Sequence, residues 1–212
     1  MTYPLAEAAQ AESELRDAAA VRSWRASQGG AEPVLPDEAL VAAIRARRSV
    51  RRFGSDPLPR DEVADLLAWS EGPIPADAPS VVTQLVTVAA VEGLEPGVYD
   101  ADLNLLEARD EGELRAASGF AAMEQDHPAR AAFDVWQMAD LEQLVADLGD
   151  RGYRWAQLEA GIRAGRLQIG AFMHGWGAGA STFYDEEVSK LLGTDLSPLL
   201  MVAIGARAGR PG

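Results

Sequence analysis

The 212-residue chain contains no cysteine and only two histidines, His127 and His174. The absence of cysteine excludes disulfide bonds, a thiolate nucleophile and cysteine-ligated zinc or iron–sulfur clusters. Two histidines disfavour a histidine-based metal site, so we expect no metal. Lysine is almost missing as well: Lys190 is the one lysine, and every other basic residue is arginine.

Long hydrophobic runs and an excess of positive charge are also missing. No apolar run approaches the roughly 18 residues of a membrane span, and no signal-peptide pattern opens the chain. We therefore expect a cytoplasmic protein without a membrane partner. The formal net charge is -14. A nucleic-acid-binding protein needs the opposite balance to neutralise phosphates, so we expect no nucleic acid partner.

Hydrophobic residues make up 48% of the chain, enough for a sizeable core. Residues 5–27 are rich in alanine and glutamate and favour a helix, and the stretch QGGAEPVLP then breaks the chain. We therefore divide the chain into an N-terminal helical arm and linker (1–35) and one folded domain (36–212).

Within the domain, helical and strand patterns follow one another in mixed order. Helices are predicted over 37–49, 57–70, 111–126 (as one or two short helices), 153–177 and 185–193, and strands over 80–94, 131–140, 179–183 and 197–205, with a strand–turn–strand unit at 97–110. Pro59 should open the second helix, while Asp185 should cap the last helix and Gly193 end it. The mixed order favours an α+β fold, because a doubly wound sheet would alternate strands and helices regularly.

The stretch RARRSVRRF, residues 45–53, places five arginines around one serine. It lies where a predicted helix ends, so Arg47, Arg48, Ser49 and Arg51 cannot all share one face. Guanidinium groups and a hydroxyl together suit a phosphate. The alternative is a solvated basic helix end that interacts with the helix dipole. Arg207 and Arg210 follow the last predicted strand and could converge on the same phosphate.

Five segments resemble the nitroreductase-like flavoproteins, in family order, over residues 41–208. They are RRSVRRFGSDPLPRDEVADLLAWS, LEPGVYDADLNLLEA, MEQDHPARAAFDVW, DRGYRWAQLEAGIRAGRLQIGAFMHGWGAGAS and LLGTDLSPLLMVAIG. The sequence is most similar to the branch of peptide azoline dehydrogenases, which oxidise thiazoline and oxazoline rings in ribosomal peptide products. The resemblance implies a central mixed or antiparallel sheet flanked by helices, an intertwined dimer, and FMN at the dimer interface.

The resemblance also implies a set of cofactor-binding residues. Arg47, Arg48, Ser49 and Arg51 match the element that binds the FMN phosphate and ring edge, and Arg207 matches the basic residue that closes on the phosphate. Ala180, Ser181, Thr182 and Phe183 match the loop whose backbone N–H groups face flavin N5 and O4. Gly175 and Gly177 would let the backbone turn into that loop.

The chain departs from the family pattern in three places. After Ser80 it runs almost directly into a strand, so the segment that supplies ribityl and substrate contacts is shortened. The Lys-Tyr pair of azoline dehydrogenases is replaced by Asp147 and Leu148, of which only Asp147 can move a proton. In the long helix, Gly165 and Arg166 stand where the family has a flanking Gln in an A-Q-N step.

No catalytic residue is identified from the sequence; Asp147, Tyr153 and His174 are candidates. Tyr153 can equally be a core or dimer-interface residue, and His174 can have a packing or capping role at the helix end. We expect His127 in a surface loop. Trp176 is the aromatic residue best placed in the sequence to line a pocket.

The leading hypothesis is an FMN-dependent dehydrogenase of peptide natural products, acting on a peptide or small-molecule substrate. One alternative is a catalytically degenerate subunit that partners an active homologue or binds a peptide. Another is an NAD(P)H-dependent nitro or ene reductase. A homodimer or a heterodimer is expected, because the long predicted helix carries apolar residues on more than one face.

Overall fold

The computed structural model describes residues 19, 38–74, 79–149 and 151–208. Six strands form one sheet in the order β3-β2-β1-β4-β6-β5, and all five neighbouring pairs are antiparallel. The strands are β1 Thr83–Val88, β2 Gly97–Asp100, β3 Leu105–Ala108, β4 Phe133–Ala139, β5 Gly177–Ser181 and β6 Ser197–Gly205. The α+β prediction is confirmed, and the described sheet is antiparallel throughout.

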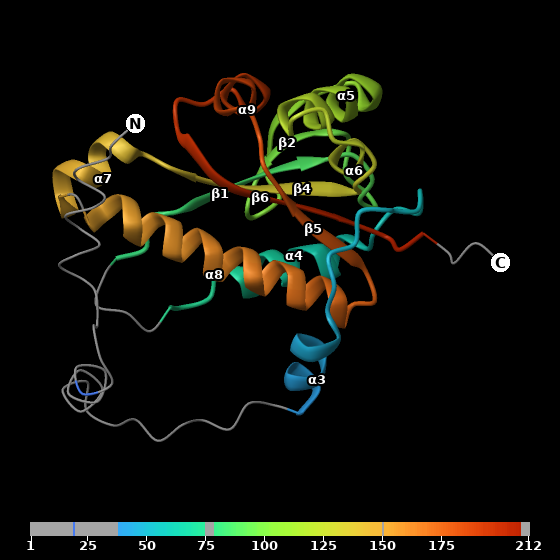
Figure 1. Ribbon diagram of the computed structural model, residues 1–212. Helices are drawn as coiled ribbons and strands as arrows, with labels where there is room; N and C mark the ends of the chain where they lie inside the picture. The colour runs from blue at the N-terminus through green and yellow to red at the C-terminus, as the bar shows by residue number, and fades with distance from the viewer. Residues whose placement is uncertain (1–18, 20–37, 75–78, 150, 209–212) are drawn as a thin grey trace.

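Helices cover both faces of the sheet (Figure 1). The helices are α3 Glu38–Ala46, α4 Arg60–Ser70, α5 Glu111–Ala121, α6 Asp126–Ala129, α7 Leu141–Leu148, α8 Arg151–Met173 and α9 Asp185–Leu192. In the view of Figure 1, α4 and α8 lie below the sheet, and α5, α6 and α9 lie above it. The helix α3 lies beneath the C-terminal end of α8.

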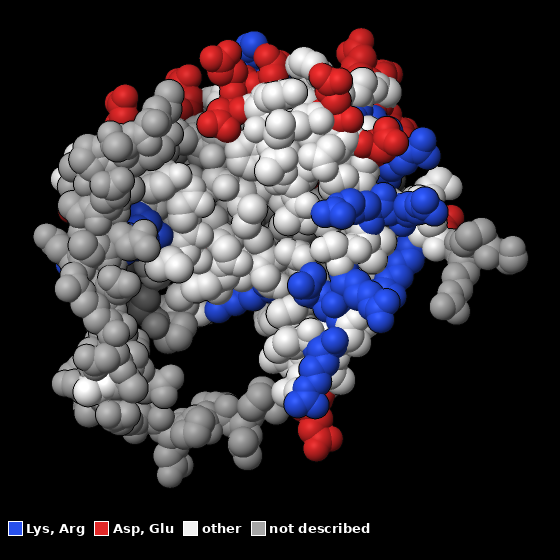
Figure 2. All heavy atoms as spheres, viewed as in Figure 1, with Lys and Arg blue, Asp and Glu red and all other residues white. Residues whose placement is uncertain are grey.

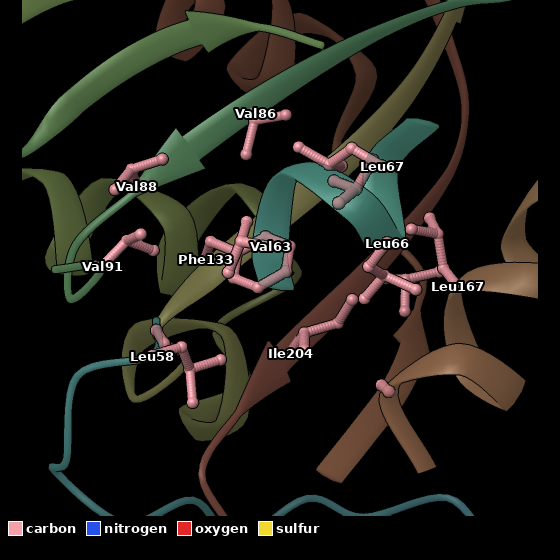
Figure 3. Close-up of a cluster of buried hydrophobic side chains, with 14 of the residues drawn as sticks. Leu58, Val63, Leu66, Leu67, Val86, Val88, Val91, Phe133, Leu167 and Ile204 are labelled. Atoms are coloured by element: carbon pink, nitrogen blue, oxygen red, sulfur yellow. The ribbon is translucent and has the colours of Figure 1, made fainter. Parts of the chain in front are cut away.

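The core follows the two-residue period of the strands. On the face covered by α4 and α8, Val63, Leu66 and Leu67 pack against strand residues such as Phe133 and Ile204 (Figure 3). The intervening strand residues Trp136 and Met138 point to the other face, under α5 and α9. Because successive strand side chains point to opposite faces, both faces of the sheet carry a buried hydrophobic layer. The predicted buried stripe of α4 is confirmed, because its three residues are at most 2% exposed.

The long helix α8 buries small residues and exposes several large apolar ones. Ala156, Ala160 and Ala164 are at most 2% exposed, whereas Tyr153 and Leu158 are more than half exposed. This agrees with the predicted apolar character on more than one face. Within the described residues, no helix is long and apolar enough to cross a membrane.

The helix α8 ends at Met173, four residues before the predicted end, and Gly175 turns the chain out of it as the resemblance implied. The φ of Gly175 is +79°, its N–H bonds the Phe172 carbonyl at 3.0 Å, and the Trp176 N–H bonds the Ala171 carbonyl at 2.8 Å. This pair of hydrogen bonds is the Schellman motif, which satisfies carbonyls at a helix end. The motif fixes the direction in which the chain leaves α8 and enters β5.

Several local predictions were wrong. Asp185 is the first helical residue of α9, and the capping position is Tyr184, which makes no side-chain capping bond. The helix α7 was not predicted, and the strand expected over 80–94 is shorter, at Thr83–Val88. The predicted arm and linker lie outside the described residues except for Ala19, as does Arg210.

Candidate functional site

The basic segment that follows α3 crosses the edge of the sheet. The Val50 N–H bonds the Ala178 carbonyl of β5 at 2.8 Å, and the Gly54 N–H bonds the Ala206 carbonyl at 2.8 Å. Between these two bonds, Phe53 forms an isolated antiparallel bridge with Arg207. The segment is therefore held by backbone contacts to the two last strands, and Arg47 and Arg207 come from opposite ends of the sequence to the same region.

Glycines in β5 permit this close crossing. A Cβ on Gly177 would lie 2.6 Å from Val50 Cγ1, and one on Gly179 would lie 2.9 Å from the Val50 carbonyl oxygen. Real side chains do not tolerate such distances, so both positions require the absence of a Cβ.

Arg47 and Arg207 are anchored one turn apart on α8. Arg47 Nη1 donates to Gln168 Oε1 at 2.9 Å. The Arg207 guanidinium lies 4.7 Å from the centre of the Phe172 ring, and its Nε donates to the Trp176 carbonyl at 2.9 Å. Residues four apart are neighbours on one face of a helix. Among the described residues, neither arginine pairs with a carboxylate, so both guanidiniums are available to bind another anion.

The other candidate phosphate-binding residues of the segment face solvent. Arg48, Ser49 and Arg51 are exposed, and within the described part of the chain their side chains have no hydrogen-bond or ion-pair partner. Figure 2 shows a band of basic side chains, interrupted by uncharged ones, along the side of the molecule where this segment runs, while most acidic residues lie along the top, above α5 and α9. The donors of this band, guanidiniums and one hydroxyl, suit a phosphate group.

The segment matched to the flavin-facing loop lies at the end of the edge strand β5. Ser181 is the last residue of β5, and its hydroxyl bonds the Thr182 carbonyl at 3.2 Å. Phe183 is half-buried and meets the ring of Trp136 edge-on at 6.2 Å, so its side chain packs on the core. Because β5 is an edge strand, no further strand covers its outer side among the described residues.

The three catalytic candidates are not brought together. Asp147 is exposed in α7, and its Oδ1 accepts a bond from Gln143 Nε2 at 2.9 Å. Tyr153, at the start of α8, lines a cavity of about 260 Å³ together with Asp185 of α9. His174 ends α8, where its Nδ1 lies 3.0 Å from Glu62 Oε2 and its ring stacks on Trp176 at 4.6 Å. The packing role considered for His174 is confirmed.

Two sequence interpretations were wrong. His127 lies in α6 and is only 3% exposed, with no hydrogen-bond partner for Nε2 among the described residues. Burial, and to a smaller extent the charge of Arg51, lowers the pKa of His127. Trp176 is 7% exposed in the core beneath the sheet, and it lines none of the four cavities described in this structure.

The segment around Ser80 is fastened to α8 by a buried ion pair. Arg163 Nη2 lies 2.7 Å from Glu159 Oε1, and both residues are at most 5% exposed. The Ser80 hydroxyl donates to Glu159 at 2.6 Å and accepts from Arg163 at 2.7 Å, and the Val81 N–H donates to Glu159 Oε2. Arg166 bonds the carbonyls of Gly72 and Pro73. The sequence shows only the four-residue spacing of Glu159 and Arg163, which does not reveal burial.

A second buried acid lies on the other face of the sheet. Asp134 is 2% exposed, its Oδ2 accepts a bond from the Thr87 hydroxyl at 3.2 Å, and its Oδ1 has no described partner. Burial raises the pKa of Asp134 to about 8, against smaller opposing effects of Ser118, Thr87 and Arg115. It is therefore protonated at neutral pH.

Comparison with known proteins gives a family and several similar structures. The family model described as the nitroreductase family matches residues 44–206. A Methanocaldococcus jannaschii protein provisionally named a nitroreductase is 28% identical over 188 residues, covering 82% of this chain and 94% of that protein.

Three solved structures share the fold. One, from Anabaena variabilis and provisionally named a nitroreductase, has a TM-score of 0.70 and 25% identity over 80% of this chain. This chain spans only 38% of that protein. The Escherichia coli microcin synthetase McbBCD complex with truncated pro-MccB17 contains a chain with a TM-score of 0.66 and 18% identity; 94% of this chain and 86% of that chain are covered.

The third is the NADPH:FMN oxidoreductase of Vibrio harveyi, with a TM-score of 0.61 and 16% identity over 82% of this chain and 71% of the other. The family model covers more than half of the sequence and spans the basic segment, the sheet and α8. The chain therefore belongs to the nitroreductase family.

Proposed function

We propose that this protein is an FMN-dependent oxidoreductase and that Arg47 and Arg207 bind the FMN phosphate. The observation that carries the proposal is their placement. Two guanidiniums from opposite ends of the sequence are anchored one helical turn apart, at Gln168 and Phe172, without a described carboxylate partner. A dianionic phosphate is the complement of such a pair.

The remaining donors extend the same site. Ser49 and Arg51 follow Arg47 on the segment and are exposed, so both can reach a phosphate or the polar edge of the ring. The edge position of β5 leaves backbone groups near Ser181 and Thr182 for hydrogen bonds to the flavin ring. When bound, FMN supplies hydride transfer, and the protein positions the substrate and excludes water.

In this proposal a second subunit completes the site. Arg48, Ser49 and Arg51 of the band are exposed in a single chain, so a partner can cover them. Exposed apolar residues of α8, including Leu158 and Ile162, provide a surface that a partner would bury. We propose a homodimer or a heterodimer with a homologue.

The substrate class that we propose is a peptide, oxidised at an azoline ring or a related C–C or C–N bond. Support comes from the five segments similar to azoline dehydrogenases and from the structural likeness to the microcin synthetase chain, which covers 94% of this chain. Reduction of a nitro compound or an alkene with NAD(P)H is the alternative within the same flavin chemistry.

One observation favours a different role, as a subunit without its own activity. Ser80 would be the nearest residue of the shortened contact segment, but both its donor and its acceptor functions are used by Glu159 and Arg163. In addition, Leu148 cannot transfer a proton and Asp147 is bonded to Gln143. Such a chain would complete the site of an active homologue or hold a peptide.

The test is to purify the protein, record its absorbance in the flavin bands, and titrate the flavin-free protein with FMN by fluorescence quenching. We expect FMN binding, weakened about ten-fold or more in Arg47→Ala/Ser49→Ala and in Arg207→Ala, because each removes a charge-assisted hydrogen bond. Arg60→Ala, at the exposed start of α4, is the matched control and should bind as the parent does.

The outcomes separate the candidate roles. A protein that stays colourless with added FMN, alone and at high concentration, contradicts the flavoenzyme proposal and favours the partner role. FMN binding that is unchanged in both arginine variants shows that the band does not hold the phosphate. Reduction of bound FMN by NAD(P)H favours a reductase, whereas reduction by an azoline-containing peptide favours the dehydrogenase.

A further inference from the structure

A cavity separate from the arginine band opens between α3, α4 and the C-terminal end of α8, which lie together in Figure 1. Its volume is about 380 Å³, within the range of small-ligand pockets. It is lined by Leu40, Asp65, Leu66, Trp69, Gly170, Met173 and His174. Most of these side chains are apolar and two are polar, which is typical of a small-molecule site.

A glycine and an aromatic ring shape the floor and one wall. A Cβ on Gly170 would lie 3.2 Å from two atoms of the Trp69 ring and would clash with Leu66. The missing side chain therefore lets α8 approach α4 and keeps the face of the indole beside an open space. Trp69 and Met173 remain about half exposed, at 42% and 52%. A π-rich or alkyl group of a ligand would bury both.

His174 is held in a fixed orientation at this cavity. Glu62 accepts from Nδ1 at 3.0 Å, and the ring lies on Trp176 with an interplanar angle of 20°. Trp176 is itself fixed by the helix-ending bonds at Gly175. The Glu62 carboxylate on Nδ1 and the stacked indole therefore fix the ring of His174 at the cavity wall.

The charges around the cavity select the sign of the ligand. Asp65 lines it, is exposed, and has no ion-pair partner in the described part of the chain. Glu62 adds a second carboxylate behind His174. The Asp65 carboxylate accepts hydrogen bonds and attracts a cation, and the Glu62 carboxylate adds to that attraction. The face of Trp69 adds attraction for a cation.

We propose that this cleft is a binding site for a primary amine that carries an apolar group, with the ammonium bonded to Asp65 and the apolar group between Trp69 and Met173. This site is independent of FMN and of the proposed oxidoreductase function. The sequence does not indicate the contact between Glu62 and His174, because the two residues are 112 positions apart in the chain.

The test uses 2-phenylethylamine as the probe and NMR of the full chain with ¹³C-methyl-labelled methionine. We expect saturable shifts of the Met173 methyl and of the Trp69 indole N–H, with a Kd of about 1 mM, as suits a ligand of this size. Phenylacetate, which has the same ring and the opposite charge, should bind at least ten-fold more weakly. Asp65→Asn should weaken amine binding about five-fold, while Asp102→Asn, an exposed acid of the β2–β3 turn, should not change it.

Three results would overturn the proposal. The first is equal binding of 2-phenylethylamine and phenylacetate, and the second is amine binding that is unchanged in Asp65→Asn. The third is a dependence of the Met173 and Trp69 signals on protein concentration and not on the amine, which would show that a second copy of the chain covers the cleft. FMN affinity, measured in parallel, should not change with the amine.

Discussion

The carboxylate of Glu159 and the guanidinium of Arg163 form a 2.7 Å ion pair in the interior, at 1% and 5% exposure. Neither residue is alone in this contact, because Ser80 bonds both and the Val81 N–H bonds the carboxylate. The pair therefore fixes the chain that enters β1 against one face of α8.

Removal of one residue of the Glu159–Arg163 pair should destabilise the protein much more than removal of both. We expect Arg163→Leu to lower the free energy of unfolding by about 3–5 kcal/mol, because it leaves a buried carboxylate without a counter-charge. The double variant Arg163→Leu/Glu159→Leu should recover a large part of this loss. Urea unfolding of the three proteins measures it, and a double variant as unstable as Arg163→Leu would contradict the explanation.

Asp134 should make the protein less stable as the pH rises. Its pKa is about 8 in the folded protein, whereas the ordinary value is 3.8, so the folded state binds more protons between these limits. Stability that depends on protonated Asp134 is complete below pH 4 and is lost towards pH 8, at about 1.4 kcal/mol per pH unit at most.

Asp134→Asn should remove this dependence. We expect the variant to gain stability relative to the parent at pH 8 and little at pH 5, in thermal unfolding followed by circular dichroism. Asp102→Asn, on the surface, is the matched control. A difference between Asp134→Asn and the parent that does not change with pH would show that Asp134 ionises normally.

His127 should make the protein less stable as the pH falls. Burial, assisted by the charge of Arg51, lowers the pKa of His127 below 6.5, so the folded state binds fewer protons than the unfolded state just below that pH. Stability is therefore complete above pH 6.5 and falls as the pH drops further. His127→Leu keeps the volume roughly and has no proton to bind, so its stability relative to the parent should rise between pH 6.5 and 5. Equal pH dependence of both proteins would contradict the prediction.

Gly177 should be intolerant of a side chain. A Cβ there would lie 2.6 Å from Val50 Cγ1, so Gly177→Ala must push the basic segment away from β5, at a cost of about 1–3 kcal/mol. We also expect weaker FMN binding, because Arg47 and Arg51 flank Val50. Gly161→Ala is the control: this helical glycine has no atom within 4 Å of a Cβ, and alanine should stabilise it by up to about 1 kcal/mol. Similar melting temperatures for the two variants would refute the steric argument.

The local sequence patterns predicted most helices and strands because they depend on near neighbours. The stripe of Val63, Leu66 and Leu67 is an example, and it is confirmed. The helix α7 was not predicted, although Asp140 caps it by accepting a hydrogen bond from the Gln143 N–H. The burial of His127 was missed because a residue distant in sequence, Gly179 of β5, lies beside its ring.

By itself, the sequence determined the class of the fold, the absence of cysteine chemistry, and a concentration of arginine after α3 in an acidic chain. Composition is a property of the sequence alone, and periodicity and turn residues act between near neighbours. Only the tertiary structure decided which groups meet: Arg47 with Gln168, Arg207 with Phe172, Glu159 and Arg163 around Ser80, and Glu62 on His174. Except for the helical pair Glu159 and Arg163, these partners are far apart in the chain. Their distances are set by sheet pairing and by glycines that let backbones approach, and no local pattern encodes those distances.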